Sequence, residues 1–475
     1  MASGAGSWIP PTLHSDGLSD AAGCVLLDMS CYIANRPNAT TAKGFTSRGL
    51  PIELTFHAAR PPVLSHLSVH CPGMDFPGSA PKVVATHADF VLLRVPINPD
   101  ALYIASTEPW DYFIYRAAQP PLLHLLPNPY PKQRFNDAEA AVLSRDGGGY
   151  VVAALRSRVP RRDPNSGEMV RNEFDLHLYR SDVADEGWVS KRLSVAEPTR
   201  DKLVPLPEAD ILMYHESGKA ITIGGKRGTV AWVDLWRGII LCDALDDCPV
   251  LRDVPLPPPA MGNWDYLLQE CSPNLFRDVA ISRSKDSIKY VEMEIQPLKQ
   301  SSDGWKATMW SMPIPVGSWE DWRRDYEVDV DEVVVEGVEE LWLAKLPGSG
   351  TETTLHGLTM IYPTISMDDE VCFLSMANGL EVLVAIDGKE KMLRGVAELD
   401  SQKDFSLMPS YCSSEISLHL KEITGTLEPL KSTEKETVEP KITEVHAKEL
   451  TRRGRRKKHV WRRVPLSDAV QFQVI

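Results

Sequence analysis

Histidine and cysteine side chains gather at one place in the sequence, the segment HLSVHCPG. His66 and His70 are four residues apart and Cys71 follows directly, and all three are side-chain types that bind zinc. A helix would bring two histidines at this spacing onto one face. The alternation of Leu67 and Val69 with polar residues, and the Pro-Gly pair that follows, favour a strand instead. We therefore predict structural histidines here, no metal site and no cofactor.

A second segment with chemical potential is GGKRG, from Gly224 to Gly228, in which glycines and two cations suit a phosphate-binding loop. Such a loop needs a Lys-Ser or Lys-Thr pair that opens a helix, whereas a strand pattern begins here at Thr229. We therefore predict a hairpin turn. The chain also contains no Gly-x-Ser-x-Gly nucleophile motif, and we predict no catalytic residue.

The most pronounced charged feature is the segment RRGRRKKHVWRR near the C-terminus. Its cations are Arg452, Arg453, Arg455, Arg456, Lys457, Lys458, Arg462 and Arg463. The segment fits a nuclear-import signal, a nucleic-acid contact in which Trp461 stacks on a base, or a solvated terminus. The chain has 51 Lys and Arg against 65 Asp and Glu, for a net charge of −14. Removing these eight cations leaves −22 for the rest, so any nucleic-acid contact is expected only through the tail.

The composition of the chain indicates the cellular compartment in which the protein is expected. The 475 residues contain no apolar run long enough to span a membrane, and the first residues lack the charged-then-apolar build of a secretory signal. Eight scattered cysteines without a Cys-x-x-Cys pair are typical of free thiols in a reducing compartment. We expect a cytoplasmic or nuclear protein that contacts no membrane.

The central part of the chain is predicted to be all-β. The 30 glycines and 37 prolines are spread along the chain and interrupt it too often for long helices. Short runs rich in Val, Ile, Leu, Tyr and Phe lie between them. The expected strands are Val83 to Ala85, Phe90 to Val95, Tyr112 to Tyr115, Tyr150 to Leu155, Leu176 to Tyr179, Ala220 to Ile223, Thr229 to Leu235 and Ile239 to Cys242. The segments Phe174 to Val195 and Lys289 to Met312 each look like a hairpin.

A loose repeat supports a particular arrangement of these strands. Segments that begin at Ser144 and Ser284 share the pattern Ser-x-Asp-x-x-x-Tyr-Val, and Ser366 begins a third Ser-x-Asp before an apolar run. Ser and Asp close turns by bonding nearby backbone N–H groups. The matches are either chance turns or a radial repeat of four-stranded blades, and we predict a β-propeller-like body of short antiparallel strands with few short helices.

The domain organisation follows from composition. Residues 1–19 are expected to be flexible and residues 20–420 to form the body. Residues 421–475 read as a charged linker and basic tail, disordered or weakly helical. Within the body, acids alternate with valines between Asp325 and Val335, which indicates a half-exposed strand with an acidic outer face.

Two consecutive segments resemble a known family. Trp232 to Asp243 reads WVDLWRGIILCD, and Leu251 to Pro259 reads LRDVPLPPP. Together they resemble the plant family defined by the domain of unknown function 1618, with the DUF1618-like region at 231–370. VLLDMSCYIANRPNATTA, HLSVHCPG, VVATHADFVLLRVPI, GYVVAAL and ISMDDEVCFL also resemble segments of that family. The resemblance implies a layout similar to F-box-associated and kelch-like modules and no established catalytic residue. We expect no F-box in the first 20 residues, which are too few and too rich in Pro and Gly for its helices.

The function expected from these observations is a non-enzymatic scaffold that binds partner proteins. Trp236 and Arg237 are the interaction candidates within the body, because Trp and Arg are favoured at interfaces, while Trp232 is expected in the core. The alternatives are a hydrolase or carbohydrate-binding protein that uses a central propeller pocket, and a nucleic-acid contact through the tail.

Overall fold

The computed structural model describes residues 23–74, 76, 80–97, 110–196, 198, 200, 213–260, 272–295, 304–335, 355, 358–368, 370–377, 380–399 and 411–424. All of them lie in one compact unit, Met1–Thr426, and a second unit covers Leu427–Ile475. The helices within the described part are too short and too polar to cross a membrane.

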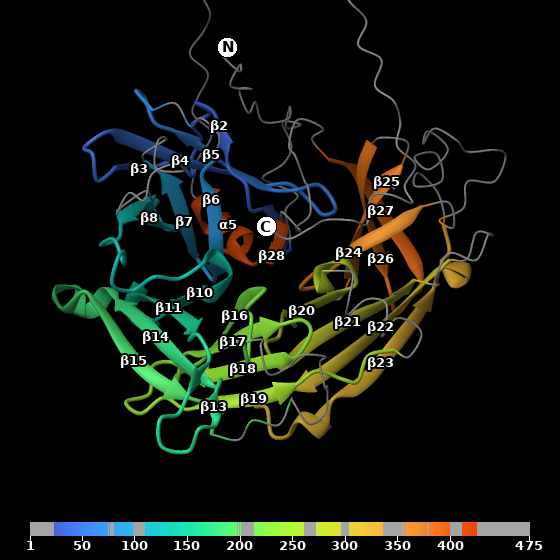
Figure 1. Cartoon of the computed structure of the whole chain (residues 1–475). Helices are drawn as coiled ribbons and strands as arrows, with labels where there is room; N and C mark the ends of the chain where they lie inside the picture. The colour runs from blue at the N-terminus through green and yellow to red at the C-terminus, as the bar shows by residue number, and fades with distance from the viewer. Residues whose placement is uncertain are drawn as a thin grey trace, which may run out of the picture. The chain divides into compact units, whose positions relative to one another are not determined.

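Six four-stranded sheets follow one another along the chain, and Figure 1 shows them arranged around a common centre. We number these blades 1 to 6. In hydrogen-bonding order, blade 1 contains β2 (Tyr32–Ile33), β5 (His66–His70), β4 (Pro51–His57) and β3 (Ala42–Phe45), and blade 2 contains β6 (Lys82–His87), β7 (Phe90–Pro96), β8 (Trp110–Arg116) and β9 (Leu122–Leu125). Blade 3 contains β10 (Ala140–Ser144), β11 (Tyr150–Ser157), β14 (Glu173–Arg180) and β15 (Trp188–Ser194), and blade 4 contains β16 (Lys219–Gly224), β17 (Thr229–Asp234), β18 (Gly238–Asp243) and β19 (Leu251–Pro255). Blade 5 contains β20 (Arg277–Ile281), β21 (Ser287–Ile295), β22 (Trp305–Pro313) and β23 (Arg323–Asp329), and blade 6 contains β24 (Thr359–Ile365), β25 (Glu370–Ala377), β26 (Leu380–Asp387) and β27 (Met392–Glu398).

Helices are short and few in the described part, as expected. They are the 3-10 turns η2 (Asp137–Glu139), η3 (Asp146–Gly148), η4 (Ser181–Glu186), η5 (Pro273–Leu275), η6 (Trp319–Asp321) and η7 (Val330–Glu332), and the α-helix α5 (Ile416–Thr424). A two-stranded ribbon of β12 (Arg161–Arg162) and β13 (Met169–Val170) extends between β11 and β14.

The β-propeller-like fold predicted from the sequence is confirmed. Every strand expected above corresponds to a strand of the structure, although β17 ends at Asp234, one residue before the expected end at Leu235. Both expected hairpins form, as β14 with β15 and β21 with β22. The second strands of blades 2 and 3, β7 and β11, are buried on both faces, because neighbouring blades cover them. This explains why their sequences are nearly continuous apolar runs rather than alternating ones.

The Ser-x-Asp recurrence marks the same position in three blades. The segments that begin at Ser144, Ser284 and Ser366 all join the first strand of a blade to its second strand. In blade 6 the turn closes as predicted, because Ser366 Oγ accepts hydrogen bonds from the backbone N–H groups of Asp368 and Glu370 at 3.2 and 3.1 Å. The recurrence therefore reflects the radial repeat.

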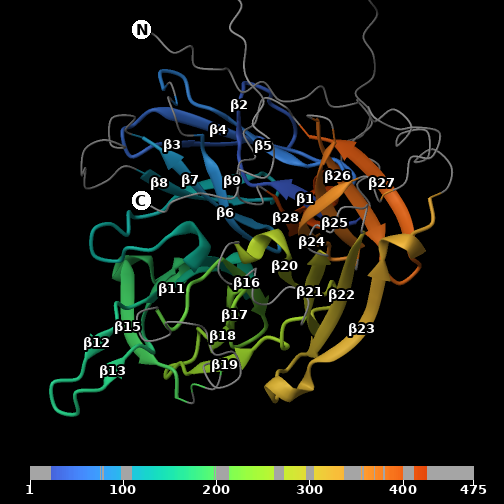
Figure 2. The same ribbon diagram turned by 45° about the vertical axis from the view of Figure 1, so that its right-hand side comes forward.

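The two ends of the described body meet in one sheet. β1 (Val25–Asp28) pairs antiparallel with β28 (Tyr411–Ser414), with Val25 opposite Ser414. α5 follows β28, and its Ile416 and Leu420 are buried in the same core cluster as Leu27 of β1. Figure 2 shows β1 and β28 side by side, between the first and last blades. Closure thus uses a pairing between chain ends, which removes exposed strand edges.

Hydrogen bonds to side chains also join neighbouring first strands around the centre, and we call this set the axial belt. It runs from Ser144 N to His87 Nδ1, from Thr222 Oγ1 to Val142 O, from Lys219 Nζ to Asp278 Oδ1, from Ile365 N to Asp278 Oδ2 and from Met367 N to Ser413 Oγ, at 2.5–3.0 Å. The β1–β28 ladder continues it, and the backbone bond from Val83 N to Met29 O, at 2.8 Å, connects that end to blade 2. The belt therefore links blades 2 to 6 into a ring that the β1–β28 ladder closes.

The acidic segment is the outermost strand of blade 5, as predicted for its first part. Asp325 pairs with Lys289 at 2.9 Å, and Glu332 pairs with Lys391 at 2.6 Å. The strand ends at Asp329 rather than continuing through the valines, because η7 follows it. Part of this acidic face is therefore neutralised by lysines of the body itself.

Removing the closing elements is expected to open the ring. A chain that ends at residue 410 lacks Tyr411, Ile416 and Leu420, which are at most 4% exposed. Burial of one such side chain contributes about 1.5–3 kcal/mol, so we expect the free energy of unfolding to fall by at least about 4 kcal/mol in urea titrations. A chain that ends at residue 426 keeps β28 and α5 and serves as the control, with the stability of the full chain. Equal stability of the two truncated chains would show that closure does not depend on β28 and α5.

Candidate functional site

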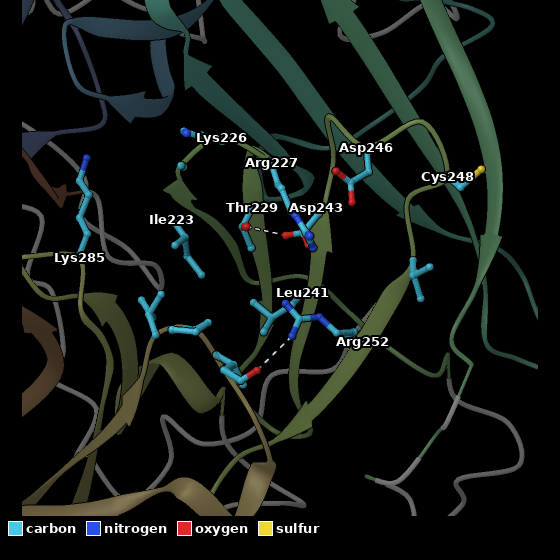
Figure 3. A pocket seen from close by; sticks show the side chains of 16 residues that line it. Ile223, Lys226, Arg227, Thr229, Leu241, Asp243, Asp246, Cys248, Arg252 and Lys285 are labelled. Carbon is cyan, nitrogen blue, oxygen red and sulfur yellow. Dashed lines mark hydrogen bonds and ion pairs between the residues drawn. The ribbon is translucent and has the colours of Figure 1, made fainter.

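A pocket of about 780 Å³ lies at the junction of blades 4 and 5. Three segments form its walls. They are the β16–β17 turn with Gly224–Thr229, the β18–β19 connection with Asp243–Arg252, and the loop after β22 with Ile314–Val316. Lys285, in the β20–β21 turn, completes it (Figure 3).

The GGKRG segment is a hairpin turn, as predicted, and its shape explains its glycines. Gly228 has a φ of +60°, and a Cβ added to it would lie 2.5 Å from Leu245 Cγ. A backbone bond from Ala244 N to Gly228 O, at 3.1 Å, ties this turn to the β18–β19 connection. The turn thus holds Lys226 and Arg227 at the edge of the pocket without any helix that could form a phosphate loop.

Cations outnumber acids around this pocket. The lining contains Lys226, Arg227, Arg252 and Lys285 against Asp243 and Asp246. Asp243 is engaged by the Thr229 hydroxyl at 2.6 Å and more distantly by Arg227 at 3.5 Å. In Figure 3, Lys226 and Lys285 lie on one side, Asp246 and Cys248 on the other, and Arg227 and Arg252 between them.

The remaining lining is apolar. Ile223 and Leu241 are buried in the core cluster that lies between blades 4 and 5, and Val316 packs with them. Val250 is 57% exposed at the same pocket. Arg252 donates a hydrogen bond to the carbonyl oxygen of Val316 at 3.1 Å, and this bond joins the two blades beneath the pocket. A cationic edge therefore surrounds an apolar floor.

Beside the pocket, an ionic contact occupies the end of the propeller axis. Glu415, between β28 and α5, accepts hydrogen bonds from the backbone N–H of Ala88 at 2.8 Å and from Lys285 Nζ at 2.9 Å. Burial disfavours the charged form of Glu415, but the bond and charge of Lys285 hold its pKa below the usual value. Glu415 thus connects blade 2 with blade 5 across the axis.

His87 lies next to this contact and belongs to the axial belt. Its Nδ1 accepts the bond from Ser144 N at 3.0 Å, and its Nε2 lies 3.4 Å from Lys285 Nζ. Burial and the charge of Lys285 lower the pKa of His87 to about 4, against the attraction of Glu415 and Asp89. The ring is therefore neutral at pH 7, and a proton on Nδ1 would break the belt at this link.

Much of the pocket lies in a segment that matches a known protein family. Residues 232–373 match the family described as protein of unknown function, DUF1618. Over these residues the chain is similar to the DUF1618 family. This match confirms the family resemblance predicted from the sequence, and the DUF1618 region supplies the β18–β19 connection, Lys285 and the loop after β22 to the pocket. No curated protein matches the chain.

Several solved structures show a distant likeness. A protein from Lactobacillus plantarum has a TM-score of 0.32 and 10% identity, with coverage of 80% of this chain and 81% of that one. Hydrazine synthase of Kuenenia stuttgartiensis has a TM-score of 0.30 and 9% identity, covering 75% and 78%. The hemagglutinin-neuraminidase ectodomain of parainfluenza virus 5 has a TM-score of 0.28 and 9% identity, covering 84% and 85%. The architecture itself is defined by the strand pairings given above.

The WVDLWRG segment of the DUF1618 region connects three blades. Trp232 is fully buried, as expected, and donates its indole N–H to the carbonyl oxygen of Glu139, ahead of blade 3, at 2.7 Å. Arg277 of blade 5 donates to Leu235 O at 3.0 Å and lies over the Trp236 ring at 5.0 Å. The tryptophans of this segment thus contribute to the packing between blades.

The two interaction candidates in this segment differ in exposure. Arg237 is 8% exposed and its guanidinium pairs with Asp234 at 2.8 Å. Burial raises the pKa of Asp234, but Arg237 and nearby cations lower it further, so the carboxylate stays charged. Arg237 is therefore buried in the turn and paired with Asp234, while Trp236 is only half-buried. Both lie in the β17–β18 turn, at the opposite end of blade 4 from the pocket.

The other candidates from the sequence do not form sites in the described residues. His66 lies in β5, as predicted, where its ring stacks on His57 at 4.8 Å. No group of three or more metal-binding side chains occurs in the part of the chain that the structure describes. The described cysteines are free thiols, and Cys248 is the exposed one among them. The tail cations Arg452 to Arg463 lie outside the described residues.

The neutral state of His87 predicts a pH dependence. The pKa of His87 is about 4 in the folded chain, whereas the ordinary value for histidine is 6.5. Between these pH values the unfolded chain therefore takes up a proton and the folded chain does not. The contribution of His87 to stability is present above pH 6.5 and is lost as the pH falls toward 4. The variant His87→Asn keeps an acceptor for Ser144 N but does not titrate. As the pH falls from 6.5 toward 4, we expect the free energy of unfolding of this variant to decrease less steeply than that of the unmodified protein. The slopes, measured in urea titrations, are expected to differ by up to about 1.4 kcal/mol per pH unit. Identical slopes for the two proteins would contradict this role of His87.

Proposed function

We propose that this DUF1618 protein is a non-enzymatic scaffold whose body binds a partner protein at the pocket between blades 4 and 5. The observation that carries the proposal is the contrast between this pocket and the axis beside it. The pocket is lined by exposed cations and apolar side chains, whereas Glu415, Lys285 and His87 at the axis bond to one another and to the backbone.

The alternative of a hydrolase needs an acid and a base that are free to exchange protons with a substrate. At the axis, Glu415 is held charged by Lys285, and Nδ1 of His87 is occupied by Ser144 N. In the pocket, Asp243 is bound by the Thr229 hydroxyl. These engagements favour binding over catalysis, because each removes a group that general acid-base chemistry would use.

Affinity purification of the full chain and of a version that ends at Leu450 tests the scaffold. The body is intact in both, so we expect the same partners to be recovered from both and identified by mass spectrometry. Partners that depend on the body are expected to survive washing in moderate salt, since an apolar floor is not screened. Recovery of no specific protein with either version, or turnover of an ester or glycoside substrate by the pure protein, would overturn the proposal.

The basic tail is proposed to direct the protein to the nucleus. The support is its eight cations within twelve residues, on a chain whose remainder is acidic. A fluorescent fusion of the full chain is expected in the nucleus, and replacement of Arg455, Arg456, Lys457 and Lys458 by Gln is expected to leave it in the cytoplasm. Replacement of Lys132 and Arg134 on the body serves as a matched control. Nuclear entry that survives the tail substitutions would rule out this role.

A further inference from the structure

The charge of the pocket at the blade 4–blade 5 junction is opposite to that of the protein around it. Its lining carries four cations and two acids, while the full chain has a net charge of −14. Within the part of the chain that the structure describes, Lys226 forms no ion pair. The side chain of Arg227 is 71% exposed. These two cations are therefore available to a ligand, unlike Lys285, which Glu415 engages.

The floor of the pocket adds a second requirement. Ile223, Leu241 and Val316 form an apolar surface in contact with the cationic edge, and Val250 is exposed beside them. A ligand that brought only negative charge would leave this surface uncovered. A ligand that brought only apolar groups would leave Lys226 and Arg227 without a counter-charge. The pocket volume of about 780 Å³ lies within the range of sites that enclose small ligands or short peptide segments.

We infer that this pocket binds an acidic peptide segment of a partner protein, in which an apolar side chain neighbours one or more carboxylates. The inference deepens the proposed function and rests on it. The carboxylates contact Lys226 and Arg227, and the apolar side chain covers the floor between Ile223 and Val316. Because the chain has a net charge of −14, a short peptide with a few charges is favoured over a long polyanion such as nucleic acid, which this net negative charge would repel.

The test uses the full chain and a labelled synthetic peptide that combines glutamates with leucine, measured by fluorescence anisotropy. Two matched peptides replace the glutamates by glutamines or the leucine by serine. We expect each replacement to weaken binding about tenfold or more, because each removes one of the two complementary contacts. Raising the salt from low to high concentration is expected to weaken the glutamate peptide but not the glutamine peptide.

Variants of the protein locate the contact. Lys226→Glu with Arg227→Glu changes two exposed side chains and is expected to weaken the glutamate peptide about tenfold or more. Lys132→Glu with Arg134→Glu makes the same change of charge between blades 2 and 3 and is expected to leave binding unchanged. Thermal unfolding of all proteins checks that the fold is retained.

The thiol of Cys248 provides an independent readout, since it is exposed and lines the pocket. The glutamate peptide is expected to slow alkylation of Cys248, and the glutamine peptide is not. A Cys248→Ser protein identifies which alkylated thiol is measured.

Three outcomes would overturn the inference. They are equal binding of all peptides, equal binding by the Lys226→Glu and Arg227→Glu protein, and displacement of the peptide by inorganic phosphate at low millimolar concentration with no contribution from leucine. The last outcome would identify a site for small anions. The proposed function fails on a different observation, the absence of any specific partner in affinity purification. A partner that is recovered but does not depend on Lys226 and Arg227 would leave the scaffold intact and reject only the acidic-peptide site.

Discussion

Closure of the axial belt is the constraint on which the rest of the structure depends. The first strand of each blade has a free edge toward the centre, and backbone groups on such an edge need partners. The molecule meets this requirement with side chains, among them His87, Thr222 and Asp278, and with the pairing of β1 and β28. The same links fix the angle of each blade to the next, so the spacing of the turns around the axis is set by the belt. The pocket is a consequence of that spacing, because its walls come from turns and loops at one end of blades 4 and 5.

Charge is distributed unevenly over the molecule. Some surface acids in and beside blade 5 have lysine partners within the body, as Asp325 and Glu332 illustrate. The cations at the pocket are less fully neutralised, because the turn geometry of Gly224 to Gly228 carries Lys226 and Arg227 away from the neighbouring strands. A pocket of one sign in a body of the other concentrates the field where the ligand has to arrive. In the proposed function, this arrangement would select a partner by charge before any apolar contact forms.

Much of the fold follows from local sequence, and little of the site does. Strands such as Phe90 to Val95 and Ile239 to Cys242 could be predicted because apolar, β-branched runs between turn residues carry their own signal. The repeat was visible where Ser and Asp close the turn, as at Ser366, but not in blade 4, where Gly224 to Gly228 form the equivalent turn without them. The pocket could not be predicted, because its walls come from three separate segments of the chain. The contact of Lys285 with Glu415 spans 130 residues. Arg237 looked like a surface anchor because sequence does not reveal that Asp234 holds it inside the turn.

The pairing of Val25 with Ser414 also determines the order of events during synthesis. Hairpins within each blade join residues that are close in sequence and can form as the chain emerges from the ribosome, whereas β1 must wait for nearly the whole body before its partner exists. Throughout that interval the edge of β1 that later pairs with β28 has unpaired backbone groups. The nascent chain therefore passes through a long period in which it depends on chaperones or on rapid completion to avoid pairing with another copy. Premature termination anywhere before β28 yields a product with six blades or fewer and an open seam, a ready substrate for quality control.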